Sequence, residues 1–220
     1  NFALRGWLGI PYGLVDCRNG RTSFLDALSF QALSFCDGQV NLNSPLVLPA
    51  HREAIRKLEA AGIVEDSLSE TDISSWQKYR RSPGRFAASA HWSITGRCNF
   101  RCRHCYMSAP QAKYSELTTA QCLEIIEQID AAGIGRVSLT GGEPLVRNDF
   151  LQLVDALCER RIVISQIYTN GMLVTDGLLD ELKSRGVSCS FSLSFDGCGC
   201  HDWMRGVDGA EEAALQAIRK

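Results

Sequence analysis

Residues 98–106 read CNFRCRHCY, and this stretch decides how the rest of the chain is interpreted. It places Cys98, Cys102 and Cys105 directly after a short apolar run at residues 92–95 that we expect to be a strand. Three thiolates on one loop can hold one metal centre, and soft sulfur ligands select zinc or iron–sulfur clusters. Three ligands are one short of a closed site. In a four-iron cube, one iron would therefore keep a position open for a substrate.

The ligand types of this loop leave two interpretations open. Besides a cluster, the same residues suit a structural zinc site completed by His104. Thiolate and imidazole ligands are compatible with either centre, so the cysteines alone do not decide between them.

A second motif favours the cluster. Gly141, Gly142, Glu143 and Pro144 follow the apolar run at residues 137–140, so they lie at the carboxyl end of an expected strand, where barrel enzymes gather their active sites. Two glycines let a ligand approach the backbone closely, and the carboxylate can accept hydrogen bonds from an ammonium group. A Gly-Gly-Glu-Pro turn one strand–helix unit after the cysteine loop indicates a catalytic site.

Strand and helix patterns alternate from about residue 91 onward, which predicts βα units around a parallel sheet. The expected strands are residues 92–95, 137–140, 163–169 and 188–195. Each helix between them has a recognisable start: a Thr118–Gln121 capping box, a cap at Asp149 and a cap at Thr175. Glycines at 133 and 186 predict where the first and third helices end.

The fourth expected strand alternates large and small side chains. Cys189, Phe191, Leu193 and Phe195 alternate with serines at 190, 192 and 194. Because side chains point to opposite faces along a strand, the large residues should meet the outer helices and the serines should line the interior. A polar interior indicates a bound ligand.

These motifs, in this order, resemble the radical S-adenosylmethionine (SAM) superfamily over about residues 88–220. The resemblance implies a partial (β/α) barrel of the TIM type. It also implies that Cys98, Cys102 and Cys105 bind a [4Fe-4S] cluster whose fourth iron is chelated by the amino and carboxylate groups of SAM. Gly141, Gly142 and Glu143 would then hold the methionyl ammonium, and His104 would contact adenine chiefly through its backbone.

Further matches to the superfamily extend the expected cofactor site. They are Thr169-Asn170-Gly171 after the third strand, Ser194-Phe195-Asp196-Gly197 after the fourth, and Arg205-Gly206. In relatives, the serine and the arginine contact SAM, which makes Asn170, Ser194 and Arg205 candidate cofactor residues here. The implied mechanism is reductive cleavage of SAM to methionine and a 5′-deoxyadenosyl radical that takes a hydrogen atom from substrate, with an electron donor of flavodoxin or ferredoxin type.

The first 70 residues have a different pattern, with short apolar runs followed by two expected helices at about residues 28–35 and 49–61. This layout predicts a small winged-helix-like α+β domain, joined by a linker at residues 71–90 to the partial barrel at 91–220. It resembles the domains that bind the leader of a precursor peptide as an added strand in peptide-maturing radical SAM enzymes. Six Lys or Arg against eight Asp or Glu disfavour the alternative of a DNA-binding winged helix.

Composition narrows the class of protein. A formal net charge of −2 offers no electrostatic basis for nucleic-acid binding. No apolar run is long enough to span a membrane and no signal peptide is recognisable, so we expect a cytoplasmic protein. Because the chain begins at Asn1 and ends within a helical pattern, we expect an N-terminal fragment of a longer protein.

The remaining cysteines and histidines are assigned separately. Cys122, Cys158 and Cys189 lie on apolar faces and are expected to pack in the core. Cys198 and Cys200 are either exposed free thiols or part of a redox or auxiliary centre. His201 and the other single histidines receive no catalytic role.

The most specific functional hypothesis is a maturase that modifies a ribosomally made precursor peptide. A radical SAM enzyme acting on a protein, as sulfatase-maturing relatives do, or on a cofactor precursor is the enzymatic alternative. A non-catalytic zinc-binding module is the alternative from another class.

Overall fold

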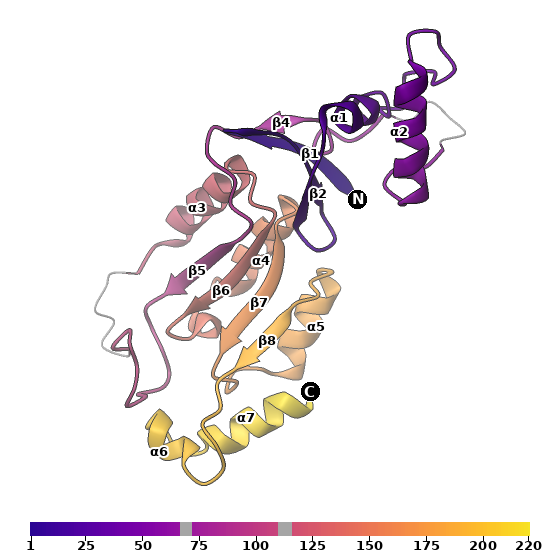
Figure 1. Ribbon diagram of the computed structural model, residues 1–220. Coiled ribbons are helices and arrows are strands. Elements are labelled where there is room, and N and C mark those ends of the chain that lie inside the picture. Colours follow the sequence, from indigo (N-terminus) through magenta and orange to yellow (C-terminus); the bar gives the residue numbers. More distant parts are fainter. Residues whose placement is uncertain (67–71, 110–115) are drawn as a thin grey trace. The chain divides into compact units, whose positions relative to one another are not determined.

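The computed structural model describes residues 1–66, 72–109 and 116–220, and it divides into two compact units, residues 1–87 and 88–220 (Figure 1). The domain boundary predicted at residue 70 falls outside the described residues. No helix in the described part of the chain has the length and apolar character needed to cross a membrane.

The N-terminal unit is built on a four-stranded sheet in the order β3-β2-β1-β4. Its strands are β1 (Phe2–Trp7), β2 (Ile10–Asp16), β3 (Arg21–Phe24) and β4 (Arg80–Arg81). The first three are antiparallel neighbours, whereas β4 runs parallel to β1. Just before β4, the backbone N–H of Leu4 donates to Gln77 O over 3.0 Å, and the Tyr79 hydroxyl donates to Pro11 O over 2.9 Å. Much of the segment expected to be a linker is therefore hydrogen-bonded to this sheet.

Two helices complete the N-terminal unit, close to their predicted positions. Helix α1 (Ala27–Ser34) is capped by Asp26, whose side chain accepts from the backbone N–H of Ser29. Helix α2 (Pro49–Ala60) begins at a proline, whose missing N–H costs nothing in the first turn. The helices bury a small core of their own, made of Ala32, Ala54, Ile55 and Leu58.

The C-terminal unit contains the parallel sheet that the βα alternation predicts. Its order is β5-β6-β7-β8 and all three neighbouring pairs are parallel. The strands are β5 (Ala90–Thr95), β6 (Arg136–Gly141), β7 (Val163–Thr169) and β8 (Ser190–Leu193). The last of them is shorter than expected, although the backbone N–H of Ser194 still donates to Thr169 O over 3.2 Å.

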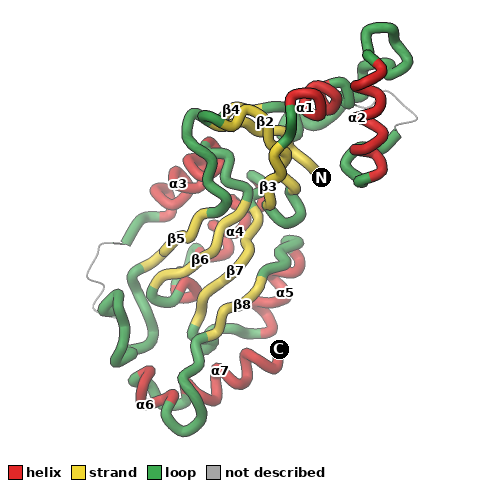
Figure 2. Tube along the Cα trace, viewed as in Figure 1, coloured by secondary structure: helices red, strands yellow, loops and turns green. Residues whose placement is uncertain are grey.

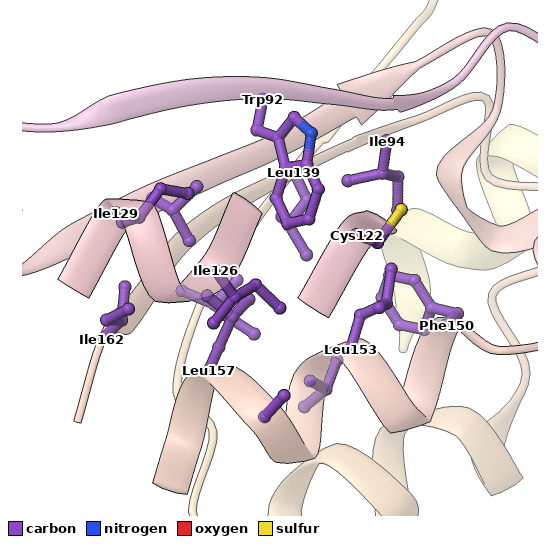
Figure 3. Close-up of a cluster of buried hydrophobic side chains, with 14 of the residues drawn as sticks. Trp92, Ile94, Cys122, Ile126, Ile129, Leu139, Phe150, Leu153, Leu157 and Ile162 are labelled. Carbon is purple, nitrogen blue, oxygen red and sulfur yellow. The ribbon is translucent and has the colours of Figure 1, made fainter. Parts of the chain in front are cut away.

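Three helices cover one face of this sheet: α3 (Thr119–Ala131), α4 (Phe150–Glu159) and α5 (Asp176–Ser184). Figure 3 shows how α3 and α4 direct Ile126, Leu153 and Leu157 towards Leu139 of the sheet. Cys122 is fully buried in this core, and Cys158 and Cys189 pack against it, which confirms their assignment as packing residues. Phe191 also packs there, as the alternation predicts, whereas Phe195 lies beyond the end of β8 and is 38% exposed.

The residues at the N-termini of α3, α4 and α5 can be compared with the predicted helix caps. Thr118 and Gln121 form the expected capping box, and Thr175 accepts from the backbone N–H of Leu178. For Asp149 only the predicted position is confirmed. It occupies the cap position of α4 but makes no side-chain cap, because its carboxylate accepts from Arg147 over 2.8 and 2.6 Å and from Thr119 over 2.7 Å.

All four parallel strands end at the same edge of the sheet, as the arrows of Figure 1 show, and Figure 2 draws the loops that leave this edge in green. The loops that follow them include the short 3-10 helix η1 (Pro144–Val146), helix α6 (His201–Arg205) and the start of α7 (Ala210–Arg219). The residues singled out by the sequence motifs are therefore gathered at this edge.

Candidate cofactor site

The cysteine loop leaves β5 and folds over a buried anchor. Phe100 is 1% exposed and its backbone N–H donates to Cys98 Sγ over 3.3 Å. A turn follows in which the N–H of Cys105 donates to Cys102 O over 3.2 Å. The three thiols are half-buried, and burial raises the pKa of Cys98. The loop thus carries the three sulfurs within one short hydrogen-bonded segment.

Helix α6 supports this loop from the other end of the unit's sequence. The backbone N–H groups of Arg101 and Arg103 donate to Arg205 O and Met204 O over 3.1 and 2.9 Å. The Arg103 side chain also donates to Trp203 O and stacks its guanidinium 4.4 Å from the centroid of the Trp203 ring. Residues about a hundred positions apart in the chain are therefore in direct contact at the cysteine loop.

The Gly-Gly pair after β6 lies against the backbone that begins the cysteine loop. A Cβ on Gly141 would lie 2.3 Å from Thr95 O, and a Cβ on Gly142 would lie 2.3 Å from Arg97 O. Gly142 N–H donates to Thr95 O over 3.0 Å, and the next N–H donates to Arg97 O over 2.9 Å. The predicted close approach to these glycines is thus made, in this structure, by another stretch of the chain.

Glu143 is fully buried and joins the loops after β6 and β7. Its Oε1 accepts from the Thr169 hydroxyl over 2.9 Å and from Leu145 N–H over 3.1 Å, while Oε2 accepts from Asn170 N–H over 2.8 Å. Burial raises the pKa of this carboxyl, and the three donors act in the opposite direction. The Asn170 amide in turn donates to Asn99 Oδ1 over 2.8 Å, which connects these loops to the cysteine loop.

The other predicted cofactor residues occupy different positions around this edge. The Arg205 side chain contacts one of the cysteines, because its Nη1 donates to Cys102 Sγ over 3.8 Å. Ser194 is half-buried at the end of β8, and His104 is exposed on the cysteine loop. The structure therefore brings Glu143, Asn170 and Arg205 into contact with the cysteine loop or its neighbours, while the described contacts give His104 no side-chain partner.

Sequence analysis missed a buried arginine next to this site. The Arg147 side chain is 3% exposed and donates to Ile94 O over 2.8 Å, besides its paired contacts with Asp149. It also reaches Glu116, which pairs with Arg97 at the start of the cysteine loop over 2.7 Å. The hydrogen bonds from Arg147 lower the pKa of Asp149 to about 2. Arginine in a loop gives no signal of burial, so only the fold identifies it.

The donor set suits a thiolate-ligated cluster. Cys98, Cys102 and Cys105 are free thiols on one loop, although no three His, Cys, Asp or Glu side chains of the described residues are arranged around a single metal position. The sulfurs do receive the polar contacts that stabilise thiolates and tune iron–sulfur centres, namely an N–H on Cys98 and a guanidinium beside Cys102. Cys98, Cys102 and Cys105 would hold the cluster.

Comparison with known sequences gives a family and several relatives. The sequence model described as "Radical SAM superfamily" matches residues 92–220. The chain is 35% identical over 153 residues to pre-heme d1 synthase of Dinoroseobacter shibae, an alignment covering 65% of this chain and 37% of that protein. It is 32% identical over 128 residues to mycofactocin maturase MftC of Mycolicibacterium smegmatis, covering 58% and 32%.

Comparison with solved structures identifies SuiB of Streptococcus suis bound to S-adenosylmethionine, with a TM-score of 0.63 and 17% identity. This match covers 99% of the present chain and 52% of SuiB. The same fold is therefore shared across nearly all of the chain. The chain spans about half of SuiB and about a third of the curated relatives named above.

Proposed function

Because the chain belongs to the radical SAM superfamily, we propose that it is part of an enzyme that modifies a ribosomally made precursor peptide. That superfamily uses a [4Fe-4S] cluster and SAM. When bound, the pair supplies a one-electron cleavage of SAM and a carbon radical that takes hydrogen from substrate. The observation that carries the proposal is the placement of the three cysteines, Glu143 and Arg205 at one edge of the parallel sheet.

Each residue at this edge has a proposed task. Cys98, Cys102 and Cys105 bind the cluster. Gly141, Gly142 and Glu143 receive the ammonium of SAM, and the oxygen with a spare lone pair is Glu143 Oε2, which accepts only from Asn170 N–H among the described residues. Asn170, Ser194, Arg205 and the backbone at His104 complete the SAM site.

The peptide substrate is proposed to bind to the N-terminal unit, which we interpret as a winged-helix-like peptide-recognition domain of residues 1–70, followed by a connecting segment to residue 90. Strand β3 is at the edge of its sheet and pairs only with β2 within the described residues. An extended peptide can add to such an edge through backbone hydrogen bonds. The likeness to SuiB over this unit supports the assignment, since SuiB was also solved bound to its precursor peptide SuiA.

A second enzymatic function is favoured by one comparison. Pre-heme d1 synthase aligns over more residues than MftC does, and its name places it in cofactor synthesis. The substrate would then be a tetrapyrrole rather than a peptide. The two proposals are separated by whether a short peptide is encoded beside the gene and, where one is, by its binding to the full-length protein, measured by calorimetry with a scrambled peptide as control.

The proposed function is tested by anaerobic reconstitution of the full-length protein. We expect about four irons and four acid-labile sulfides per chain, and 5′-deoxyadenosine when dithionite and SAM are added. Alanine at Cys98, Cys102 or Cys105 should abolish both, whereas Cys158→Ala, which removes a packing thiol, should retain them. One zinc per chain without sulfide would instead establish the binding-module alternative.

The exposed pair Cys198 and Cys200 is tested in the same preparation. Cys200 Sγ lies 3.5 Å from Gly197 O, a backbone contact that requires no metal. We therefore expect the double serine variant to keep the wild-type iron content. A loss of iron beyond the first cluster would assign these thiols to an auxiliary centre.

A further inference from the structure

One ion pair lies directly against a proposed cluster ligand. Arg205 uses Nε and Nη2 to grip Asp196 Oδ2 and Oδ1, over 2.7 and 3.1 Å, in a two-pronged contact. Its remaining nitrogen, Nη1, donates to Cys102 Sγ over 3.8 Å. A guanidinium is planar and permanently charged. Because Nε and Nη2 are both bound to Asp196, the direction in which Nη1 points is also fixed. The fork on Asp196 therefore aims a positive charge at a single sulfur.

The carboxylate of this pair is itself held in place. The backbone N–H of Asp196 donates to His201 Nδ1 over 3.0 Å, and His201 is fully buried with its ring tilted against Phe195. The arginine is fixed from the other side, because its carbonyl accepts from Arg101 N–H of the cysteine loop. Both ends of the ion pair are thus attached to backbone that carries or supports the cysteines.

Burial distinguishes this pair from the other charges of the cysteine loop. The side chains of Arg205 and Asp196 are 11% and 21% exposed. The Arg97 side chain, by the same measure, is 51% exposed, so solvent and salt screen its charge more strongly. The nearest buried charge is Glu143, which acts on the Cys98 side of the loop. At Cys102 the Arg205–Asp196 pair is the principal partly buried charge among the described contacts.

We propose that the Arg205–Asp196 pair sets the reduction potential of the cluster through the charge that it places at Cys102. This rests on the proposed function. Reduction adds one negative charge to the cluster, so a nearby cation favours the reduced state and a nearby carboxylate opposes it. Arg205 raises the potential and Asp196 offsets that effect. His201 acts as a positioning residue by anchoring Asp196.

The test is the midpoint potential of the reconstituted full-length protein, measured by dithionite titration followed by EPR. SAM is left out, so that a role of Arg205 in SAM binding does not enter. Arg205→Gln is expected to shift the potential downward and Asp196→Asn to shift it upward. The double variant, which removes both charges, should return close to wild type. Arg185→Gln and Asp155→Asn alter a comparable pair over 2.7 Å on the helical side and should leave the potential unchanged.

A merely structural role predicts a different pattern. If the substitutions acted by loosening the cysteine loop, the midpoint potential would shift in the same direction in both single variants. The potential of the double variant would then differ from wild type at least as much as that of either single variant. That result overturns the proposal. Should Asp196→Asn lose its iron, Arg205→Lys decides: retention of the charge should keep the potential near wild type, whereas an equal fall in Lys and Gln variants overturns it. A wild-type protein that binds no cluster refutes the proposed function itself.

Discussion

Two buried charged side chains organise the cofactor edge at the scale of single residues. Glu143 and Arg147 are separated by four positions, and each uses its hydrogen-bonding capacity on loops from different strands. Burial of a charge is costly unless hydrogen bonds or an opposite charge compensate it. Here the compensation also ties loops together, so the edge of the sheet gains order from groups that would otherwise destabilise it.

Loss of the Asp149 carboxylate should therefore be costly. Arg147 lowers the pKa of Asp149 from 3.8 to about 2, a difference worth about 2 kcal/mol of folding free energy. Asp149→Asn should reduce the free energy of unfolding by about that amount at pH 7. Because the pKa is depressed in the folded state, the stabilisation is present above pH 4 and disappears as the pH falls towards 2.

Urea denaturation of both proteins between pH 7 and pH 3 measures this effect. The difference between wild type and Asp149→Asn should narrow below pH 4. Asp155→Asn provides the control, since Asp155 pairs with Arg185 but is 49% exposed, and exposed pairs contribute little. A difference that stays constant with pH would mean that Asp149 acts through packing.

For single residues, the sequence predicts which side chains belong to the site better than it predicts which residues they contact. The motifs at Cys98, Gly141 and Arg205 were recognisable because their spacing is regular. The partnership of Asp196 with Arg205 was not, and His201 received no catalytic role, because their contacts depend on a turn whose geometry no local pattern encodes. Asp149 shows the converse: its position predicts a side-chain cap, but the charged guanidinium of Arg147 donates to both of its oxygens instead.

The most consequential element is α6, a helix of five residues. Its backbone carbonyls accept from the cysteine loop, and it ends at Gly206 with φ of 68°. A short helix has little stability of its own. The contacts between α6 and the cysteine loop must therefore stabilise both segments.

Gly206→Ala should disrupt this arrangement. A Cβ there would lie 2.6 Å from Arg101 O, a backbone atom that moves only with the cysteine loop. We expect loss of more than half of the bound iron after reconstitution. Gly186→Ala is the matched control, because Gly186 has φ of 70° and open space around the added atom. Equal iron loss in both variants would attribute the effect to left-handed strain rather than to the contact.

Elements with strong periodicity were predictable and short ones were not. Strands β5 to β7 and helices α3 to α5 follow the patterns of buried residues that the sequence shows. Strand β4 has two residues and exists because Arg80 and Arg81 align with β1, a contact between distant segments. No window of sequence contains that information.

At the scale of the whole chain, the two units have separate hydrophobic cores. The core around Leu58 and the core around Leu157 share no residue. Leu58→Ala should destabilise its own core by about 2 to 5 kcal/mol. Its hydrogen exchange should accelerate in α1 and α2, with iron content unchanged and binding of the precursor peptide weakened.

Leu157→Ala should instead affect the C-terminal unit, with faster hydrogen exchange in β5 to β8 and loss of iron. Both leucines lie on helices and are buried, so the comparison is matched. Hydrogen exchange by mass spectrometry follows both units in one experiment. If Leu58→Ala also released iron, the cores would be energetically coupled despite their separate composition.

The fit of Gly141 and Gly142 against Thr95 and Arg97 has a consequence for how sites of this kind can change over time. These two positions are constrained by a neighbouring stretch of main chain, not only by a cofactor. A related protein that had lost the activity would still need both glycines, because a side chain at either position would clash with the neighbouring main chain. The two glycines are therefore constrained by the fold as well as by any cofactor that binds there.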